Sequence, residues 1–393
     1  MSRLGDAIEE VENARRPEPD HPKGWEPGVT WDGKSGNILA ATSNKSPDWA
    51  ALLSAWDMDP DVVEVIEPVQ MRSWDAAIGN GEVRRMYYYK ASIRRKRGTG
   101  PDIDDLVKGI RKHKARKYTP QDGDTAFLLA LADLQVGKKG TAEVIDAMLR
   151  SIDAHAQRLK ALRKCGHRID DVYIACLGDL IESCDGHYDM QTFEVELDER
   201  EQRRLARHVV MYAVERFAPL AARLIIVAVP GNHGENRKDG KSFTSFGDNS
   251  DLEVPEAVGE ACRTNPDAFG HCSFVIPQKV MTVTLDIAGV IVGFAHGHQA
   301  RSGTNASKKV ENWWSGQAFG NRPVGDAAIL LSGHYHSLDI TEHSTDRTHI
   351  QCPTMDAGSQ WYAETAGNES MAGMLSLCIG KHFRQGWDEL KVI

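Results

Sequence analysis

Three short apolar runs in the middle of the chain alternate with two longer amphipathic segments. The runs cover residues 125–133, 171–179 and 223–233, and the amphipathic segments cover residues 141–166 and 197–218. Short apolar runs are typical of strands buried on both faces, whereas apolar residues that recur every three or four positions are typical of helices. This alternation predicts a layered α/β domain.

After residue 270 the pattern changes to short strands with few helices. Residues 280–298 contain two apolar runs around Ala288 and Gly289, which predicts a β-hairpin that turns at these two residues. Further strands are predicted at residues 327–336, 348–355 and 373–380.

The first third of the chain predicts a small, separate folded unit. Residues 1–28 are polar and proline-rich, and we expect a tail or an irregular lead-in there. A hairpin is predicted at residues 28–42, a helix at 46–56 and a strand at 82–98. A charged helical linker follows, so we expect an accessory domain at residues 1–120 and a main domain at residues 121–393.

Composition narrows the class of protein. A chain of 393 residues suggests two domains, and a net charge of -9 argues against a uniformly basic surface. The seven cysteines are scattered and form no CxxC pair, which favours reduced thiols in the cytoplasm over a disulfide framework or zinc ribbon. The N-terminus lacks the apolar region of a signal peptide, and no run is long enough to span a bilayer.

Five short polar motifs share one placement, because each follows a predicted apolar strand. A loop in that position can project a ligand from a rigid edge of a sheet. A lone buried histidine is more often structural than functional, but here the order, the placement and the ligand chemistry agree. The motif residues are Asp133 and Gln135; Asp179; Asn232 and His233; His296; and His334 and His336.

These residue types suit a pair of divalent metal ions. Two ions about 3.5–4 Å apart need a bridging carboxylate together with oxygen and imidazole ligands. Asp179 is the expected bridge. We expect Asp133, Gln135 and His336 to complete the shell of one metal, and Asn232, His296 and His334 to complete the shell of the other.

The ordered series D-x-[H/Q], GD-x-x-[D/E], GNH, HGH and GH-x-H resembles the calcineurin-like metallophosphoesterase superfamily over residues 125 to about 340. The resemblance implies a four-layer α/β/β/α sandwich and in-line attack on a phosphoester by a metal-bridging hydroxide. It also implies that His233 contacts the phosphate or protonates the leaving oxygen, and that Glu182 orients His233. His298, Arg237 and Lys241 are the expected substrate-binding residues.

The sequence departs from the family pattern at two positions. Gln135 stands where a histidine is usual, and its harder amide oxygen shifts the first site toward Mn²⁺ or Mg²⁺ and away from Zn²⁺ or Fe²⁺; Mn²⁺ is the expected metal. Gly234 follows the GNH motif, where many members have an acid. We therefore assign no catalytic role to Glu235, which comes one position later.

The first domain favours a nuclease, which would resemble the Mre11/SbcD-type branch and hydrolyse DNA. Residues 84–117 are rich in lysine and arginine, and they include Tyr87, Tyr88 and Tyr89. Basic groups neutralise phosphates, and aromatic rings stack on unpaired bases. The same residues also fit a solvated face over a small core. Likewise, Lys308, Lys309, Trp313 and Trp314 can line a channel, or the tryptophans can anchor an insertion.

Three alternatives stay open. A small-molecule phosphodiesterase, for instance of cyclic nucleotides, would have the same catalytic core. A protein phosphatase usually shows GD-x-V-D-R-G, and the present GDLIESCDG has no arginine after the acid. An inactive binding scaffold is the third. The character of the sequence along the whole chain resembles that of phage-encoded members of the superfamily. A homodimer is also compatible with the sequence.

Overall fold

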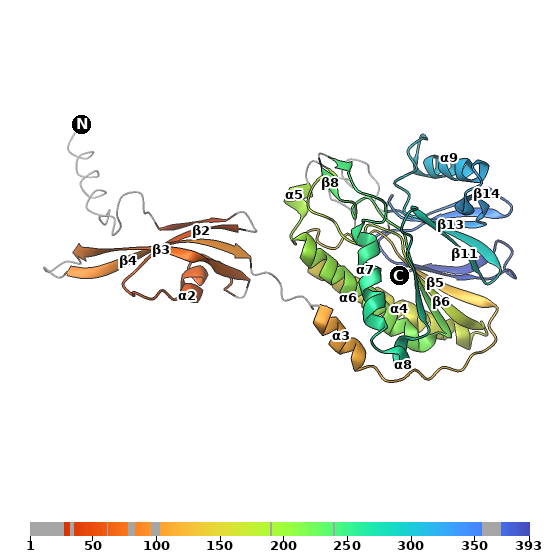
Figure 1. Cartoon of the computed structure of the whole chain (residues 1–393), viewed down its shortest axis with the longest axis horizontal. Helices are drawn as coiled ribbons and strands as arrows, with labels where there is room; N and C mark the ends of the chain where they lie inside the picture. Colours follow the sequence, from red (N-terminus) through yellow and green to blue (C-terminus); the bar gives the residue numbers. More distant parts are fainter. Residues whose placement is uncertain are drawn as a thin grey trace, which may run out of the picture. The chain divides into compact units, whose positions relative to one another are not determined.

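The computed structural model describes residues 27–31, 35–60, 62–77, 83–95, 103–188, 191–238, 240–355 and 371–393 (Figure 1). The chain divides into two compact units, Met1–Gly98 and Thr99–Ile393. Residues 1–26 of the lead-in predicted at residues 1–28 lie outside the described residues. The boundary at residue 98 differs from the one predicted near residue 120, because helix α3 (Ile103–Arg111) packs into the core of the second unit through Ile110.

The first unit is an antiparallel sheet with one short helix. Its strand order is β1 (Gly28–Trp31), β2 (Ser35–Thr42), β4 (Val83–Arg95) and β3 (Val63–Ala77). Helix α2 (Trp49–Ser54) begins after Asp48, whose side chain accepts a hydrogen bond from the backbone N–H of Ala51. The hairpin, helix and strand predicted for this region are confirmed.

Two of the three consecutive tyrosines belong to the core of the first unit. Tyr88 is fully buried, and its ring centroid lies 5.5 Å from that of Trp74. Tyr89 is also buried and packs edge-on against Trp49 at 5.8 Å. Their burial favours the core interpretation over stacking on bases.

The second unit contains two sheets. The first has six strands in the order β10 (Cys272–Val275), β7 (Arg223–Ala228), β6 (Ile169–Cys176), β5 (Thr125–Leu131), β16 (Leu375–Ile379) and β17 (Trp387–Val392). The first four strands are parallel to one another, β16 pairs antiparallel with β5, and β17 pairs antiparallel with β16.

The second sheet has five strands in the order β11 (Thr282–Ile287), β12 (Val290–Ala295), β13 (Ile329–Ser332), β15 (Arg347–Gln351) and β14 (Asp339–Ser344). Strands β12, β13 and β15 run parallel. The predicted hairpin is β11–β12, and its turn residues Ala288 and Gly289 both have positive φ, at 51° and 81°. Two residues of positive φ match the turn that favours tight hairpins.

The helices of the second unit cover the outer faces of the two sheets (Figure 1). Helices α4 (Thr141–Lys164), α6 (Glu199–Phe217) and α7 (Ser250–Cys262) pack on the six-stranded sheet. Helix α9 (Ala306–Phe319) packs on the other sheet through Trp314. The predicted α/β/β/α sandwich is confirmed. Shorter elements are α5 (Gln191–Glu194), α8 (Pro266–Phe269), η1 (Ala218–Leu220), η2 (Pro323–Asp326), β8 (Arg237–Lys238) and β9 (Lys241–Ser242).

Strand β5 shows why the apolar runs form the centre of this sandwich. Phe127 and Leu129 face the helices, whereas Leu128 and Ala130 face the second sheet. Successive side chains of a strand point to opposite faces, so an unbroken apolar run can contact both neighbouring layers. The strand is therefore a rigid support for the loop that follows it.

Candidate metal centre

The motif residues gather at one edge of the two sheets. Asp133, Asp179 and Asn232 lie on the loops after the parallel strands β5, β6 and β7. His296 and His334 follow the parallel strands β12 and β13. Parallel strands end at the same edge, which is the usual place for ligand-binding loops in open α/β sheets.

Five of the seven predicted metal ligands have left-handed backbone conformations. The φ angles are 50° for Asp133, 43° for Gln135, 50° for Asp179, 71° for His334 and 57° for His336. Residues other than glycine adopt this region at a free-energy cost, and such residues cluster at functional sites. The repeated pattern indicates that the loops are shaped to aim these side chains inward.

One group of predicted ligands surrounds His296. The ligand atoms of Asp179, His296 and His334 all lie within 4.8 Å of one another. His296 Nε2 is 3.0 Å from Asp179 Oδ2 and 3.1 Å from Asn232 Oδ1. On the other side of the ring, Nδ1 donates a hydrogen bond to the Leu177 carbonyl oxygen at 2.7 Å, which fixes Nε2 toward the centre.

The second group lies around Asp133. His336 Nε2 is 3.4 Å from Asp133 Oδ1, and the backbone N–H of Gln135 donates to the Asp179 carbonyl oxygen at 2.9 Å. Gln135 Oε1 is buried and has no hydrogen-bond partner among the described residues. An unpaired buried oxygen costs free energy, and a metal ion would supply its partner. The described residues thus offer one compact ligand group at Asp179, His296 and His334, and further candidate donors around Asp133.

Charge at this centre is balanced between Asp179 and His296. Burial opposes ionisation of Asp179, but the neighbouring imidazolium of His296 outweighs it and holds the pKa of Asp179 well below its usual range. Burial likewise opposes protonation of His296, yet Asp179 raises the pKa of His296 to about 10. A positive charge beside the buried Asp179 carboxylate therefore stabilises this centre.

His233 is held by two residues of the loop that follows β6, Asp179 and Glu182. Its Nδ1 donates to the Glu182 carbonyl oxygen at 2.8 Å, and its backbone N–H donates to Asp179 Oδ1 at 2.8 Å. The Glu182 carboxylate oxygen is 3.6 Å from His233 Nδ1, and Tyr188 donates to the other carboxylate oxygen at 2.7 Å. The carbonyl of Glu182 thus holds the ring by a hydrogen bond, and its carboxylate lies within ion-pair distance of the same nitrogen.

His187 is a neighbour of His233 that the motifs do not reveal. The two imidazole rings stack with centroids 4.3 Å apart and an angle of 8° between their planes. Burial and the adjacent His233 lower the pKa of His187 to about 3, so its ring packs as a neutral group. His187 lies in an irregular loop, and its sequence context gives no signal for this contact.

The predicted substrate-binding residues occupy different environments. His298 is partly buried, with Nε2 3.8 Å from Glu235 Oε1, and this burial and the neighbouring His296 lower the pKa of His298 to about 3. Arg237 Nη2 is 2.9 Å from the other Glu235 oxygen. Lys241 is exposed on β9. His298 and Arg237 thus come together at Glu235, to which we had assigned no role.

The tryptophans of helix α9 serve the packing of the second sheet. Trp314 is buried, and its indole N–H donates to the Val324 carbonyl oxygen at 2.7 Å. Trp313 packs against the same cluster. Lys308 forms an ion pair with Glu311 at 2.6 Å. These contacts favour the anchoring interpretation over a substrate channel.

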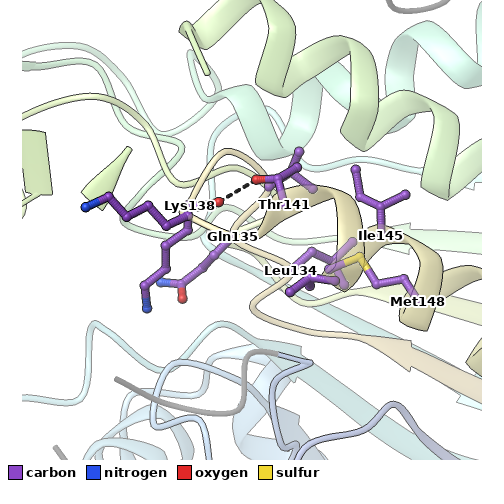
Figure 2. A pocket seen from close by; sticks show the side chains of 9 residues that line it. Leu134, Gln135, Lys138, Thr141, Ile145 and Met148 are labelled. Carbon is purple, nitrogen blue, oxygen red and sulfur yellow. Dashed lines mark hydrogen bonds between the residues drawn. The ribbon is translucent and has the colours of Figure 1, made fainter. Parts of the chain in front are cut away.

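A small pocket borders the metal centre at Gln135 (Figure 2). Figure 2 shows Gln135 at one end of this pocket and Met148 and Ile145 at the other. Gln135 is the single predicted ligand that lines it, so the pocket adjoins the centre without containing it. The lining residues are Leu134, Gln135, Val136, Lys138, Lys139, Thr141, Val144, Ile145 and Met148.

Comparisons with known proteins yield structural likeness alone. No protein-family profile and no curated protein sequence matches this chain.

Among the residues that the structure describes, no helix combines the length and the apolar character required to cross a membrane. All seven cysteines lie among these residues, and none of them forms a disulfide there.

Three solved structures illustrate the likeness. Vacuolar protein sorting 29 from Cryptosporidium parvum is 15% identical over 65% of this chain and 86% of its own, with a TM-score of 0.30. A conserved uncharacterized protein from Streptococcus pneumoniae, described as a predicted phosphoesterase, is 10% identical over 65% and 83%, with a TM-score of 0.28. Vps29 from Entamoeba histolytica, complexed with Zn²⁺, is 12% identical over 64% and 84%, with a TM-score of 0.28. Likenesses this weak carry no argument about function.

Proposed function

We propose that this chain is a two-metal-dependent phosphodiesterase. The observation that carries the proposal is the convergence of five separate loops, which bring carboxylate, amide and imidazole groups to one edge of the sandwich. Asp133, Gln135, Asp179 and His336 would hold one ion. Asp179, Asn232, His296 and His334 would hold the other.

The bound ions would supply charge stabilisation for the phosphoryl oxygens and would activate a water molecule as nucleophile. The chain itself fixes the geometry. Leu177 holds the ring of His296 through a hydrogen bond, and the backbone N–H of His334 donates to both oxygens of Asp133 at 3.0 and 2.9 Å. Such contacts keep ligands oriented before substrate arrives.

His233 is the proposed proton donor to the leaving oxygen. Its Nδ1 is engaged by the Glu182 carbonyl, which leaves Nε2 free to face the reacting phosphoester, 4.0 Å from Asp179 Oδ2. A positioned acid of this kind contributes roughly 10²–10⁴-fold to the rate. The ring of His187 supports His233 from the side.

We propose further that the substrate is a nucleic acid, most simply DNA. Ribbon β8–β9 and the turn after it carry exposed Lys238 and Lys241 together with Phe243, which is 65% exposed, and Phe246, which is 50% exposed. This segment closely follows the motif residue His233. Lysines attract phosphates, and exposed aromatic rings can stack on unpaired bases.

The first unit gives weaker support than its sequence suggests. Arg85 pairs with Asp75 at 2.8 Å and Arg94 pairs with Glu64 at 2.6 Å, so part of the basic charge is neutralised within the sheet. Arg84 and Lys90 are exposed. We therefore place the main nucleic-acid contacts beside the metal centre.

Hydrolysis of bis(p-nitrophenyl) phosphate with added Mn²⁺ tests the phosphodiesterase activity, with Asp179→Asn as the inactive control. Asp146→Asn, at an exposed acid on α4, is the matched control and should retain activity. Absence of Mn²⁺-dependent hydrolysis by the wild type would refute the proposed activity and favour an inactive binding scaffold. A second panel of single-stranded DNA, duplex DNA, RNA and cyclic nucleotides tests the substrate. Selective turnover of cyclic nucleotides would refute the nuclease proposal.

A further inference from the structure

Asp251 is a fully buried carboxylate that lies outside the motifs. It stands in the first turn of α7, and it accepts three backbone hydrogen bonds. Oδ2 accepts from the N–H of Asp179 and of Gly231, both at 2.9 Å, and Oδ1 accepts from the N–H of Leu180 at 2.8 Å. One carboxylate therefore joins the loop of Asp179 to the loop of Asn232.

Neighbouring residues fix the start of α7 on the same loops. Asn249 caps the helix and accepts from the N–H of Asp251 at 2.9 Å, and its amide donates to the Gly231 carbonyl oxygen at 2.9 Å. The N–H of Ser250 donates to the Gly234 carbonyl oxygen at 2.8 Å. Asp251 thus has little freedom to move relative to the loops it joins.

Gly234 leaves the space that this carboxylate occupies. A Cβ atom at position 234 would lie 2.6 Å from Asp251 Oδ2 and 2.3 Å from Asn249 Oδ1, which is too close for any side chain. Position 234 directly follows the GNH motif, where the sequence lacks the acid that the family pattern leads us to expect. Helix α7 brings a carboxylate to the same place from a different part of the chain.

We infer that Asp251 is a positioning residue for the metal centre, and that it replaces the acid missing at position 234. This inference rests on the proposed function, because it concerns the same pair of ions. By fixing the Asp179 and Gly231 backbones, Asp251 sets how the Asp179 carboxylate and the adjacent Asn232 amide approach one ion. It acts on the ligands and does not touch substrate.

The first test is Mn²⁺ binding to the full chain, measured by isothermal titration calorimetry. Asp251→Asn keeps the size of the side chain but turns an amide N–H₂ toward backbone donors. We expect a folded protein whose Mn²⁺ affinity is about 10–100-fold weaker, the usual effect of losing an outer contact to a ligand. Glu256→Gln, at an exposed acid on the same helix, is the matched control and should bind Mn²⁺ like the wild type.

Activity separates positioning from general support of the fold. For Asp251→Asn, kcat measured on bis(p-nitrophenyl) phosphate at a fixed, limiting Mn²⁺ concentration should fall and should recover as Mn²⁺ is raised, while KM changes little. Unchanged Mn²⁺ affinity in a folded Asp251→Asn variant would overturn the inference. If the wild type itself fails to bind Mn²⁺, the proposed metal centre fails and this inference fails with it.

A second pair of variants covers the case in which Asp251→Asn does not fold. Asn249→Ser with Asp251→Gly removes the crowding at position 234, and serine still suits a helix cap. Adding Gly234→Asp to that pair should restore Mn²⁺ binding relative to the pair alone, because the carboxylate returns by the other route. Failure of the triple variant to fold, or to gain affinity over the pair, would overturn the inference.

Discussion

His233 donates its Nδ1 hydrogen to the backbone carbonyl oxygen of Glu182 at 2.8 Å, whereas the Glu182 carboxylate oxygen lies 3.6 Å from the same nitrogen. A carbonyl cannot be removed by a side-chain substitution. The orientation of His233 should therefore survive changes to Glu182 that keep the loop intact, which separates the contributions of the two residues.

His233→Ala should lower turnover by roughly 10²–10⁴-fold, because a positioned acid acts in the transition state. Its metal content should stay near that of the wild type, since Asn232 is the proposed ligand. The loss should be smaller on a diester with a nitrophenolate leaving group, which needs little protonation. Metal stoichiometry and leaving-group dependence check this prediction.

Glu182→Gln is the companion variant and should lose far less activity than His233→Ala, because the carbonyl that orients the ring is kept. A defect as large as that of His233→Ala would show that the carboxylate takes part directly. Loss of a metal from His233→Ala would show that the GNH motif is misassigned by one residue.

Gln135→His should shift metal preference from Mn²⁺ toward Zn²⁺ or Fe²⁺. The amide oxygen of Gln135 is buried without a partner, and imidazole in its place is a softer ligand. The measurement is hydrolysis after reconstitution with each metal in turn. Gln157→His, at an exposed position on α4, is the matched control. Identical preferences in the two variants would remove Gln135 from the ligand set.

The second unit should tolerate removal of residues 1–98 better than removal of residues 1–120. The longer deletion removes α3, whose Ile110 is fully buried and whose carbonyl oxygen accepts from Asn265 Nδ2 at 2.8 Å. Burying an isoleucine side chain alone contributes about 1.5–3 kcal/mol. Urea unfolding of the two truncated proteins checks the difference, and equal midpoints would contradict the division at residue 98.

Stability should fall in acid partly through His155 on α4. Its ring is fully buried beside the Met374 carbonyl oxygen, and burial lowers the pKa of His155 to about 4 from an ordinary value of 6.5. Between these values the unfolded chain binds more protons than the folded chain, so stability decreases as pH falls through this window. The slope from this one group is at most about 1.4 kcal/mol per pH unit.

His155→Gln keeps a donor for the Met374 carbonyl but removes the titrating group. Urea unfolding at a series of pH values checks the prediction. The variant should be less stable than the wild type at pH 8, and this difference should shrink as the pH approaches 4. A constant difference across the range would show that His155 does not contribute to acid sensitivity.

The layered fold and the grouping of the motif residues could be predicted because each buried strand is visible in the sequence as a short, unbroken apolar run. Each motif directly follows an apolar run, and parallel strands bring their ends together whatever the details of the helices. The sequence leaves the core role of Tyr88 open, because residues that suit a buried strand also suit a stacking surface. Side-chain direction settled it, through contact with Trp74.

Contacts between distant segments could not be predicted. Helix α7 has a capping signal at Asn249, but Pro255 inside it and its separation from every motif conceal its role. Asp251 reads as an ordinary acid of a first helical turn. Its importance depends on α7 meeting the loops of Asp179 and Gly231, a relationship that no local pattern contains.

The crowding at Gly234 makes positions 234 and 251 mutually exclusive sites for a single carboxylate. A chain with acids at both positions has a steric clash, since a Cβ at position 234 would lie 2.6 Å from Asp251 Oδ2. A chain with neither leaves three buried backbone donors unpaired. Any series of single substitutions that leads from one arrangement to the other therefore passes through a less stable variant. We expect strong epistasis between these positions and Asn249, whose Oδ1 would lie 2.3 Å from a Cβ at position 234, so that an acid at position 234 is tolerated only when both neighbours change.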